Sequence, residues 1–440
     1  MEYQKFNCTS YNIHTIKTDK FKTVRMEIIF SREVKKEEMP IFTFLCDLLT
    51  DSSKKYKTRK DIAIELEELY KSIFYGVTNK VGNLFMASFV MEFIDPQFIN
   101  EKDYLKKVVS FPFEIINNPR VKNKEFDITS FNIVKRRMIQ EIESIKENPD
   151  KLAISGALKK MNENSPSSYK VLGTIEDVEK ITPENLYNAY NDLFEHSNCD
   201  IFIIGNTNMD KIVEIIKDKF VNRVIKLKNN SLVVQNNTRK KPLKVNEKSN
   251  FVQSTLVMIY NINNLNKLQK NVDFHVFNYI LGTGGISSKL YKNLRTDNSL
   301  CYSVRSLYLK YDELLIVEVS LDKENVKLAE KLIKKSINEM VKSDYSDDTL
   351  NDAKKNLLFS LKMGMDNNVS ILNNYVFNVY DKLPLLSERI ELINNVTRED
   401  LNKCAQSLSL NTIYIQNAGD KNEWDKIKRF KWNHIWRCMW

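Results

Sequence analysis

Apolar and polar residues recur in a fixed order along the first half of the chain. Alternating apolar residues on both sides of a polar turn predict a β-hairpin over residues 11–30. Apolar residues at helical spacing predict helices over residues 39–49 and 61–74, with a polar break between them. The apolar run over residues 83–95 predicts a strand that closes this unit.

The second half of the chain repeats this order. A strand, a helix, a glycine-rich break, a second helix and a closing strand are predicted over residues 254–262, 271–281, 282–288, 289–296 and 313–322. Each half then ends in a helix and a strand, and Thr182 and Thr397 are suited to cap those two helices. Self-similarity at half the chain length predicts a duplicated domain of the α+β class. We expect each copy to be a mainly antiparallel sheet covered by helices.

Composition divides the chain further. We expect an N-terminal domain over residues 1–225, a linker over 226–250, a C-terminal domain over 251–422 and a tail over 423–440. The linker carries seven basic residues and one Glu, which favours a solvated segment over a nucleic-acid contact. The tail places four Trp residues on one side of a predicted helix. Packing on its own domain is the first interpretation of the tail; docking to a partner and contact with a membrane surface are the others.

Charge and cysteine content narrow the class of protein. The formal net charge is +10 over 440 residues, a surplus that alone selects no partner. The six cysteines are scattered singly without a Cys-x-x-Cys spacing, which is typical of reduced thiols and not of a disulfide framework. No signal peptide and no apolar run near 18 residues is visible. We therefore expect a cytoplasmic protein.

Several segments together resemble the insulinase and mitochondrial-processing-peptidase family of zinc metallopeptidases, in its short two-domain bacterial form. They are "KKYKTRKDIAIELEELY" and "VKRRMIQEIESIKENPDK" in the first half and "ILGTGGISSKLYKNLRTDNSLCYSV" in the second. The resemblance implies a clamshell of two homologous domains. The chain is most similar to members that serve as the non-catalytic half of a two-chain protease.

Active members of that family carry His-x-x-Glu-His, which supplies two zinc ligands and a general base. The resemblance places these three positions at Thr43, Cys46 and Asp47, and the third ligand at Glu141. The chain has four His residues and no two lie one helical turn apart, so a zinc site of this type cannot form. Another metal held by Cys46, Asp47 and Glu141 is the weaker alternative to a buried Cys and a surface Glu141 paired with Arg137. We expect no cofactor in this chain.

The second half retains the residues that assist catalysis in relatives. Arg295 and Tyr302 match an Arg and a Tyr that reach the zinc site carried by the opposite half of the clamshell, and both can donate to a developing oxyanion. The alternative roles are a structural ion pair and a core tyrosine. The segment between them, 296–299, departs from the family pattern, so the turn that aims Tyr302 is expected to differ.

A glycine-rich loop precedes this pair. Gly282, Gly284, Gly285 and Ser287 are predicted to line a peptide-binding chamber. The spacing does not match the phosphate-binding loop G-x-x-x-x-G-K-[ST], and a helical run precedes it where a strand would be needed.

The resemblance implies a function. The chain is expected to be inactive alone and to pair with a homologous zinc-bearing subunit, with which it would enclose and process peptides such as the leaders of ribosomally made peptides. A peptide-binding scaffold that cuts nothing is the alternative. A translation-associated factor that binds nucleic acid through the basic linker is a more remote one, and we expect no nucleic-acid partner.

Overall fold

The computed structural model describes residues 1–221 and 231–419. They form two compact units, each of which takes one segment from the other half of the sequence. The first unit comprises Met1–Ser144, Tyr169–Val233 and Leu361–Leu386. The second comprises 145–168, 234–360 and the described residues from Ser387 onward. The predicted contiguous boundaries, 1–225 and 251–422, differ from these units by two exchanged segments. The Trp-rich tail lies outside the described residues.

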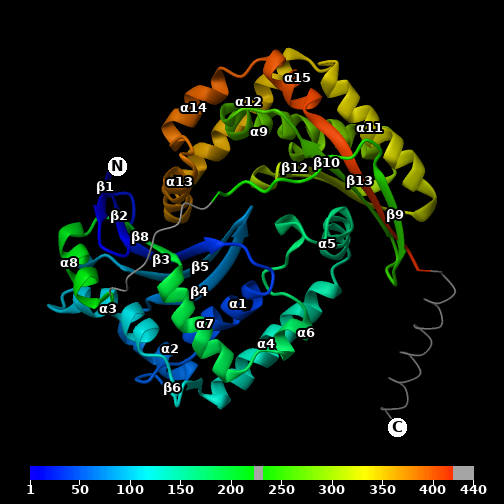
Figure 1. The fold of residues 1–440 in the computed structure, drawn as a ribbon. Helices are drawn as coiled ribbons and strands as arrows, with labels where there is room; N and C mark the ends of the chain where they lie inside the picture. The colour runs from blue at the N-terminus through cyan, green and yellow to red at the C-terminus, as the bar shows by residue number, and fades with distance from the viewer. Residues whose placement is uncertain (222–230, 420–440) are drawn as a thin grey trace, which may run out of the picture. The chain divides into compact units, whose positions relative to one another are not determined.

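The first unit is built on a six-stranded sheet in the order β1-β2-β8-β3-β5-β4 (Figure 1). Its strands, in that order, are Glu2–Asn7, Asn12–Lys17, Asn198–Gly205, Thr23–Glu33, Leu84–Ile94 and Ile73–Val81. All neighbours are antiparallel except β2 and β8. The predicted hairpin over residues 11–30 is therefore wrong, because β8 lies between β2 and β3. A two-stranded ribbon, β6 (Val121–Lys122) and β7 (Glu125–Phe126), stands apart from this sheet.

Helices and strands of this unit share one apolar core. Its helices are α1 (Glu38–Leu49), α2 (Arg59–Glu68), α3 (Tyr104–Asn117), α4 (Ile128–Lys146), α6 (Ile175–Glu179), α7 (Pro183–His196), α8 (Met209–Lys219) and α13 (Asn368–Asp381). Residues such as Phe44, Phe89 and Val134 are fully buried in the core. The predicted helix over 61–74 is too long, since the chain turns through Tyr70 and Lys71, both at positive φ, and enters strand β4.

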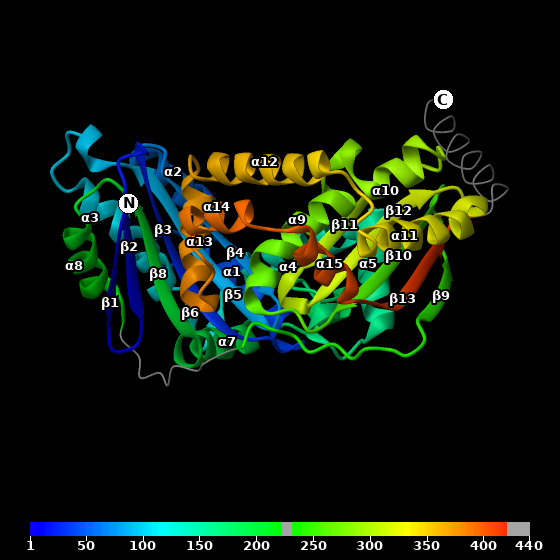
Figure 2. The ribbon, with the colours of Figure 1, turned by 90° about the horizontal axis from the view of Figure 1, so that it is seen from above.

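The second unit repeats the first. Its sheet has the order β11-β12-β10-β13-β9, formed by Cys301–Leu309, Leu314–Leu321, Ser254–Ile262, Leu408–Asn417 and Leu243–Lys248. Here too one pair is parallel, β9 with β13, which run side by side in Figure 2. Apart from β1, the two sheets thus share one strand order and one set of orientations. The linker prediction over 226–250 was wrong for Leu243–Lys248, because these residues are the counterpart of β2.

The helices of the second unit also follow the first half. They are α5 (Pro149–Met161), α9 (Phe274–Asn278) between two π-turns, α10 (Lys289–Tyr291) followed by a π-turn, α11 (Val326–Val341), α12 (Asp347–Gly364), α14 (Leu386–Asn394) and α15 (Arg398–Gln406). Thr182 and Thr397 cap α7 and α15 as predicted, each through a capping box. Helix α5 packs its small residues Ala153 and Ala157 on the second sheet beside Tyr414.

A buried polar network attaches α13 to the first sheet. The His14 ring is completely buried, with Nε2 3.0 Å from Asp200 Oδ1 and Nδ1 2.8 Å from the hydroxyl of Tyr3. Tyr380 of α13 donates to the other oxygen of Asp200 at 3.1 Å. The network satisfies groups that would be costly to bury alone, so it fixes a helix from the second half of the sequence on the first unit.

Candidate functional site: a filled metal position and an exposed arginine–tyrosine pair

Helix α1 presents the three positions that correspond to the zinc motif. Thr43 is 6% exposed; its hydroxyl donates to the carbonyl of Val171 at 3.1 Å and lies 3.1 Å from the hydroxyl of Thr78 on β4. Cys46 is 1% exposed, and its Sγ lies 3.8 Å from the carbonyl oxygen of Ser88. Burial raises the pKa of this thiol, so it is neutral and a poor metal ligand.

Strand β4 closes over Cys46. A Cβ at Gly76 would lie 2.7 Å from Cys46 Sγ and 3.0 Å from its carbonyl oxygen, so only glycine fits there. A residue as long as the catalytic Glu of active relatives has no room at position 46. Cys46 is therefore the small buried apolar side chain that the sequence predicted.

Arg137 pairs with carboxylates at the C-terminal end of α1, and not with Glu141. Arg137 of α4 contacts Asp47 at 3.7 Å and Asp51 at 3.2 Å, where a hydrogen bond forms. Burial raises the pKa of Asp47, an effect that Arg137 opposes and the carboxylates of Glu141 and Asp51 reinforce. The predicted pair between Arg137 and Glu141 is wrong, because within the described residues Arg137 pairs with Asp47 and Asp51 instead. A cation stabilises the nearly buried carboxylate of Asp51 more than the solvated carboxylate of Glu141.

The residues present therefore do not fit zinc. Among the described residues no three His, Cys, Asp or Glu side chains are grouped as a metal site. The guanidinium of Arg137 links α1, which would bear two zinc ligands, to α4, which would bear the third. A second positive charge at that place would be repelled.

The second unit brings Arg295 and Tyr302 together. Arg295 follows α10, and its Nη1 donates to the backbone carbonyl of Tyr302. Its guanidinium carbon lies 4.5 Å from the centre of the Tyr302 ring and 5.1 Å from that of Tyr291. Tyr302 is 81% exposed, so neither it nor its hydroxyl belongs to a core. The structural alternatives, an ion pair and a core tyrosine, are not what the structure shows; the catalytic role stays a prediction.

The turn between these two residues closes without glycine. Ser299 adopts a left-handed φ of 52°, and its N–H donates to the Arg295 carbonyl at 2.8 Å. The pairing of β11 with β12 is irregular between Cys301 and Val304, which leaves Tyr302 outside the ladder. The departure from the family pattern is thus accommodated locally.

The glycine-rich loop has a structural reason for each glycine. A Cβ at Gly282 would lie 2.3 Å from Ser306 Oγ, and one at Gly284 would lie 2.7 Å from the carbonyl of Tyr279. Gly285 has φ of +61° with open space around it, and the Ser287 hydroxyl donates to the Gly284 carbonyl at 2.9 Å. The loop presents the Ile286 side chain at 77% exposure, an apolar group that sequence reasoning missed. Binding of peptide by this loop remains a prediction.

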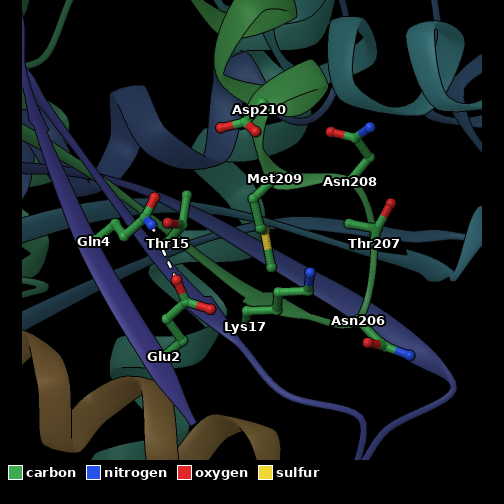
Figure 3. Close-up of a pocket in the computed structure, with 9 residues that line it drawn as sticks. All are labelled: Glu2, Gln4, Thr15, Lys17, Asn206, Thr207, Asn208, Met209 and Asp210. Atoms are coloured by element: carbon green, nitrogen blue, oxygen red, sulfur yellow. Dashed lines mark hydrogen bonds between the residues drawn. The ribbon is translucent and has the colours of Figure 1, made fainter.

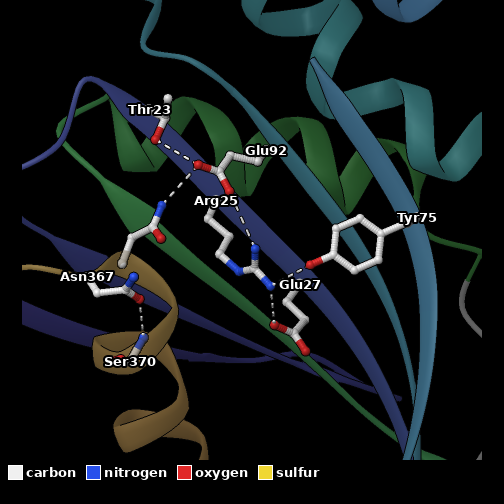
Figure 4. Close-up of polar contacts among 8 residues, drawn as sticks. Thr23, Arg25, Glu27, Tyr75, Glu92, Asn367 and Ser370 are labelled. Carbon is white, nitrogen blue, oxygen red and sulfur yellow. Dashed lines mark hydrogen bonds and ion pairs between the residues drawn. The ribbon is translucent and has the colours of Figure 1, made fainter. Parts of the chain in front are cut away.

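Sequence reasoning also missed a polar cluster on the first sheet. Arg25 is 5% exposed and contacts Glu27 at 3.5 Å and Glu92 at 3.4 Å (Figure 4). Its Nη2 donates to the hydroxyl of Tyr75 at 3.2 Å, and Asn368 of α13 donates to Glu92 at 3.2 Å. Arg25 and Glu27 at alternate positions of β3, and the single charge of β5 at Glu92, were the available signal.

This cluster supports the edge strand β4. Tyr75 and Ile73 are 39% and 55% exposed, and within residues 1–221 and 231–419 strand β4 pairs with β5 alone. An exposed edge presents unpaired backbone donors and acceptors to an extended chain.

Comparison with known proteins is consistent with this site. Residues 180–357 match the family model of the Peptidase M16 inactive domain. The resemblance inferred from the sequence is confirmed: these residues match the inactive domain of the M16 zinc peptidases. The matching model is of the inactive kind, which agrees with the expectation that the chain is not a catalytic metallopeptidase by itself. Among the described residues, no helix combines the length and apolar character needed to cross a membrane.

Individual relatives match this chain over most of their length. A probable inactive metalloprotease of Bacillus subtilis, YmfF, is 24% identical over 423 residues, which cover 91% of this chain and 94% of that protein. A non-peptidase homolog of Helicobacter pylori, YmxG, is 24% identical and covers 71% of this chain and 70% of that protein.

Solved structures confirm the fold. A conserved protein from Enterococcus faecalis has a TM-score of 0.88 at 23% identity, covering 95% of this chain and 99% of that chain. A peptidase M16 inactive domain from Pseudomonas fluorescens has a TM-score of 0.74 at 17% identity, covering 96% and 98%. They bear out the predicted α+β class with two sheet-containing halves.

Proposed function

We propose that this chain is the silent subunit of a two-chain zinc peptidase of the cytoplasm. Its partner is a homologous chain with an intact His-x-x-Glu-His motif, which holds the zinc. The two chains enclose and process peptides, leader sequences of ribosomally made peptides among them. Arg295 and Tyr302 act at the partner's site by donating to the oxygen of the scissile carbonyl.

The exposed Arg295–Tyr302 pair is the observation that carries this proposal. A guanidinium stacked on a ring that is 81% exposed contributes little to the stability of its own unit. Retention of such a pair in a chain whose metal positions are filled suits a role toward another molecule.

Edge strand β4 supports the peptide part of the proposal. Its unpaired backbone groups and exposed Ile73 and Tyr75 are suited to an extended peptide, and Arg25 holds the Tyr75 hydroxyl in place.

Binding without cleavage is the second candidate. The carbonyl of Tyr302 already accepts a hydrogen bond from Arg295, so the guanidinium is engaged before any substrate arrives. In a scaffold the pair would only shape the wall of a peptide chamber.

The test is a peptidase assay on this chain, on a homologous chain with the intact motif, and on their mixture, with zinc measured in each. We expect cleavage only in the mixture and zinc only in the partner. Arg295→Ala and Tyr302→Phe should lower kcat of the mixture by about 10-fold to 1000-fold, the range seen when one oxyanion donor is removed.

The matched control is Lys292→Ala, an exposed cation of the same π-turn. It should leave the mixture active. Binding of peptide by the mixture without cleavage would favour the scaffold, and cleavage with zinc in this chain alone would refute both.

A further inference from the structure

The second sheet ends at strand β9, whereas the matching strand of the first sheet lies inside its sheet. In the first unit β1 pairs antiparallel with β2 along its whole length. In the second unit no described residue takes the place of β1, so β9 pairs with β13 alone. Figure 2 shows β9 beside β13 at the margin of that sheet. The outer edge of β9 is therefore left uncovered by the described chain.

The backbone groups at this edge follow from the pairing of β9 with β13. The N–H of Ser249, directly after β9, donates to the carbonyl of Asn417 at 2.9 Å. Successive residues of a strand turn their backbone groups to opposite sides, so the odd-numbered residues of β9 face β13. The N–H and C=O groups of Lys244, Asn246 and Lys248 thus point away from the sheet, and all three residues are exposed. Such a row can bind an extended chain through main-chain hydrogen bonds.

Cations lie at both ends of this edge. Lys240 and Lys241 come just before β9, and Lys248 is its last residue. All three are exposed, and none of them forms an ion pair with another described residue. An acidic chain would be attracted to such an edge.

The acids that contact β9 do not neutralise these three cations. Glu247 contacts Lys160 at 2.9 Å, and Glu330 contacts Lys244 at 2.6 Å. Lys244 is thereby compensated within its own unit. The charge available to a partner comes from the two lysines before β9 and from the lysine at its end.

A cavity of about 790 Å³ adjoins the amino end of β9. Its lining includes Arg239 and Lys240 from the segment before β9 and Lys403 of α15, and no acidic side chain of the described residues lines it. Lys403 pairs with Glu399 of its own helix at 2.9 Å. Arg239 and Lys240 therefore supply the uncompensated charge, which favours a negative group in this cavity.

The first unit shows how a strand is held at the equivalent edge. Strand β1 places Glu2 directly opposite Lys17, the last residue of β2 (Figure 3). Lys248 corresponds to Lys17, because each is the last residue of its strand and of the parallel pairing with β13 or β8. A strand added to β9 in the orientation of β1 would place an acid opposite Lys248. Its carboxyl end would then lie toward the cavity of Arg239 and Lys240.

Charge disfavours two other occupants of this edge. A second copy that paired its own β9 here would bring lysines against lysines, a device by which natural sheets avoid edge-to-edge pairing. Residues 420–440 carry six basic and three acidic side chains, so this segment is positively charged as well. An acidic segment from another molecule is complementary to the edge.

We propose that the edge of β9 binds an extended acidic peptide segment as an added antiparallel strand. Lys244, Asn246 and Lys248 supply the main-chain hydrogen bonds, and the acids of the peptide meet Lys248 and the cavity of Lys240. This deepens the proposed function, on which the role of the peptide as a substrate rests, by naming its class as acidic. Binding needs neither the partner chain nor zinc, so it can fail while cleavage by the mixture is observed, and the reverse.

The test is fluorescence anisotropy of labelled peptides with the full chain alone, at constant ionic strength. We expect saturable binding of a peptide of alternating Glu and Thr, and binding at least about 10-fold weaker when Lys replaces each Glu. Two further peptides carry N-methyl groups on every Glu or on every Thr, and keep the charge. Only one set of N–H groups faces β9, so one of these peptides should lose at least about 10-fold in affinity and the other little.

Variants of the chain locate the binding. The double variant Lys240→Glu/Lys248→Glu should weaken the acidic peptide at least about 10-fold. The matched control is the same double change at Lys323 and Lys331, two exposed cations outside this edge, and it should weaken binding far less. Asn246→Pro removes one outward N–H and no hydrogen bond to β13, and should weaken binding about 3-fold to 10-fold. An unchanged thermal midpoint shows that each variant is folded.

Several results would overturn the proposal. Equal losses in the two N-methylated peptides, or in the two double variants, would mean unspecific charge attraction. Tighter binding of an oligouridine of the same charge would assign the surface to nucleic acid, and tighter binding of synthetic segment 420–440 would assign the edge to the chain itself. A dimer of the chain that Asn246→Pro abolishes would assign it to a second copy. The absence of saturable binding by the acidic peptide would refute the site outright.

Discussion

Arg137 Nη1 lies 3.2 Å from Asp51 Oδ1 and joins α4 to the turn that follows α1 through a carboxylate that is nearly buried. In an active relative these two helices would meet around zinc. Here a fixed side-chain cation connects them, so the fold keeps its helix packing without a metal. The contacts of Arg137 with Asp47 and Asp51 thus take the structural place of a bound metal.

The first prediction concerns this contact. Arg137→Met should lower the free energy of unfolding by about 1–3 kcal/mol, because Asp51 loses its cation while its side chain stays 7% exposed. Chemical denaturation at pH 7 measures the change, with Arg136→Met on the exposed side of α4 as the matched control. Adding Asp51→Asn to Arg137→Met should recover most of the loss. Equal effects of Arg136→Met and Arg137→Met would contradict this account.

Position 46 offers a second prediction. Cys46→Glu should destabilise the chain by more than about 3 kcal/mol, because a carboxylate would be buried against Gly76 and the Ser88 carbonyl without a donor. Cys46→Ala removes only a small apolar group and should cost about 1 kcal/mol. Thermal unfolding of the two variants compares them. A stable Cys46→Glu protein would mean that the helix can still accommodate the catalytic residue.

The attachment of α13 gives a third prediction. Tyr380→Phe should remove the hydrogen bond to Asp200 and cost about 1–2 kcal/mol. Amide hydrogen exchange in residues 368–381 should quicken more than exchange elsewhere in the first unit. Tyr375→Phe is the control, since Tyr375 packs its ring on Tyr3 with centroids 5.2 Å apart and keeps that contact as Phe. Uniform acceleration across the unit would argue against a local role for Tyr380.

His275 gives a fourth prediction, for the second unit. Burial, reinforced by the cations of Arg389 and Lys310, lowers the pKa of His275 to about 4. The unfolded chain therefore binds a proton at this residue near pH 6.5 while the folded chain does not. The stability associated with His275 is complete above about pH 6.5 and is lost as pH falls toward 4. The fall in unfolding free energy between pH 7 and pH 4 should be smaller in His275→Phe by about 3 kcal/mol. An unchanged difference between the two pH values would show that His275 is protonated in the folded chain.

The duplicated order of elements was predictable because it depends on local patterns. Capping threonines, apolar periodicity and glycine breaks identify helices and strands within short windows. The partners of each strand were not predictable in this way. Strand β8 enters between β2 and β3 from about 170 residues downstream, and β9 lies within a segment whose basic residues hid the alternation of Leu243 and Val245.

The candidate site also has features that the sequence determines and features that only the tertiary structure determines. Absence of paired histidines in the sequence by itself excluded the zinc motif, because ligand chemistry depends on residue type and spacing. Arg295 and Tyr302 were expected to act together from the family resemblance, since a seven-residue separation by itself indicates no contact. Arg137 with Asp51 and the His14–Asp200–Tyr380 network join residues that are 86 or more positions apart. Only the tertiary structure decides such contacts, because burial and long-range strand pairing determine which charges meet.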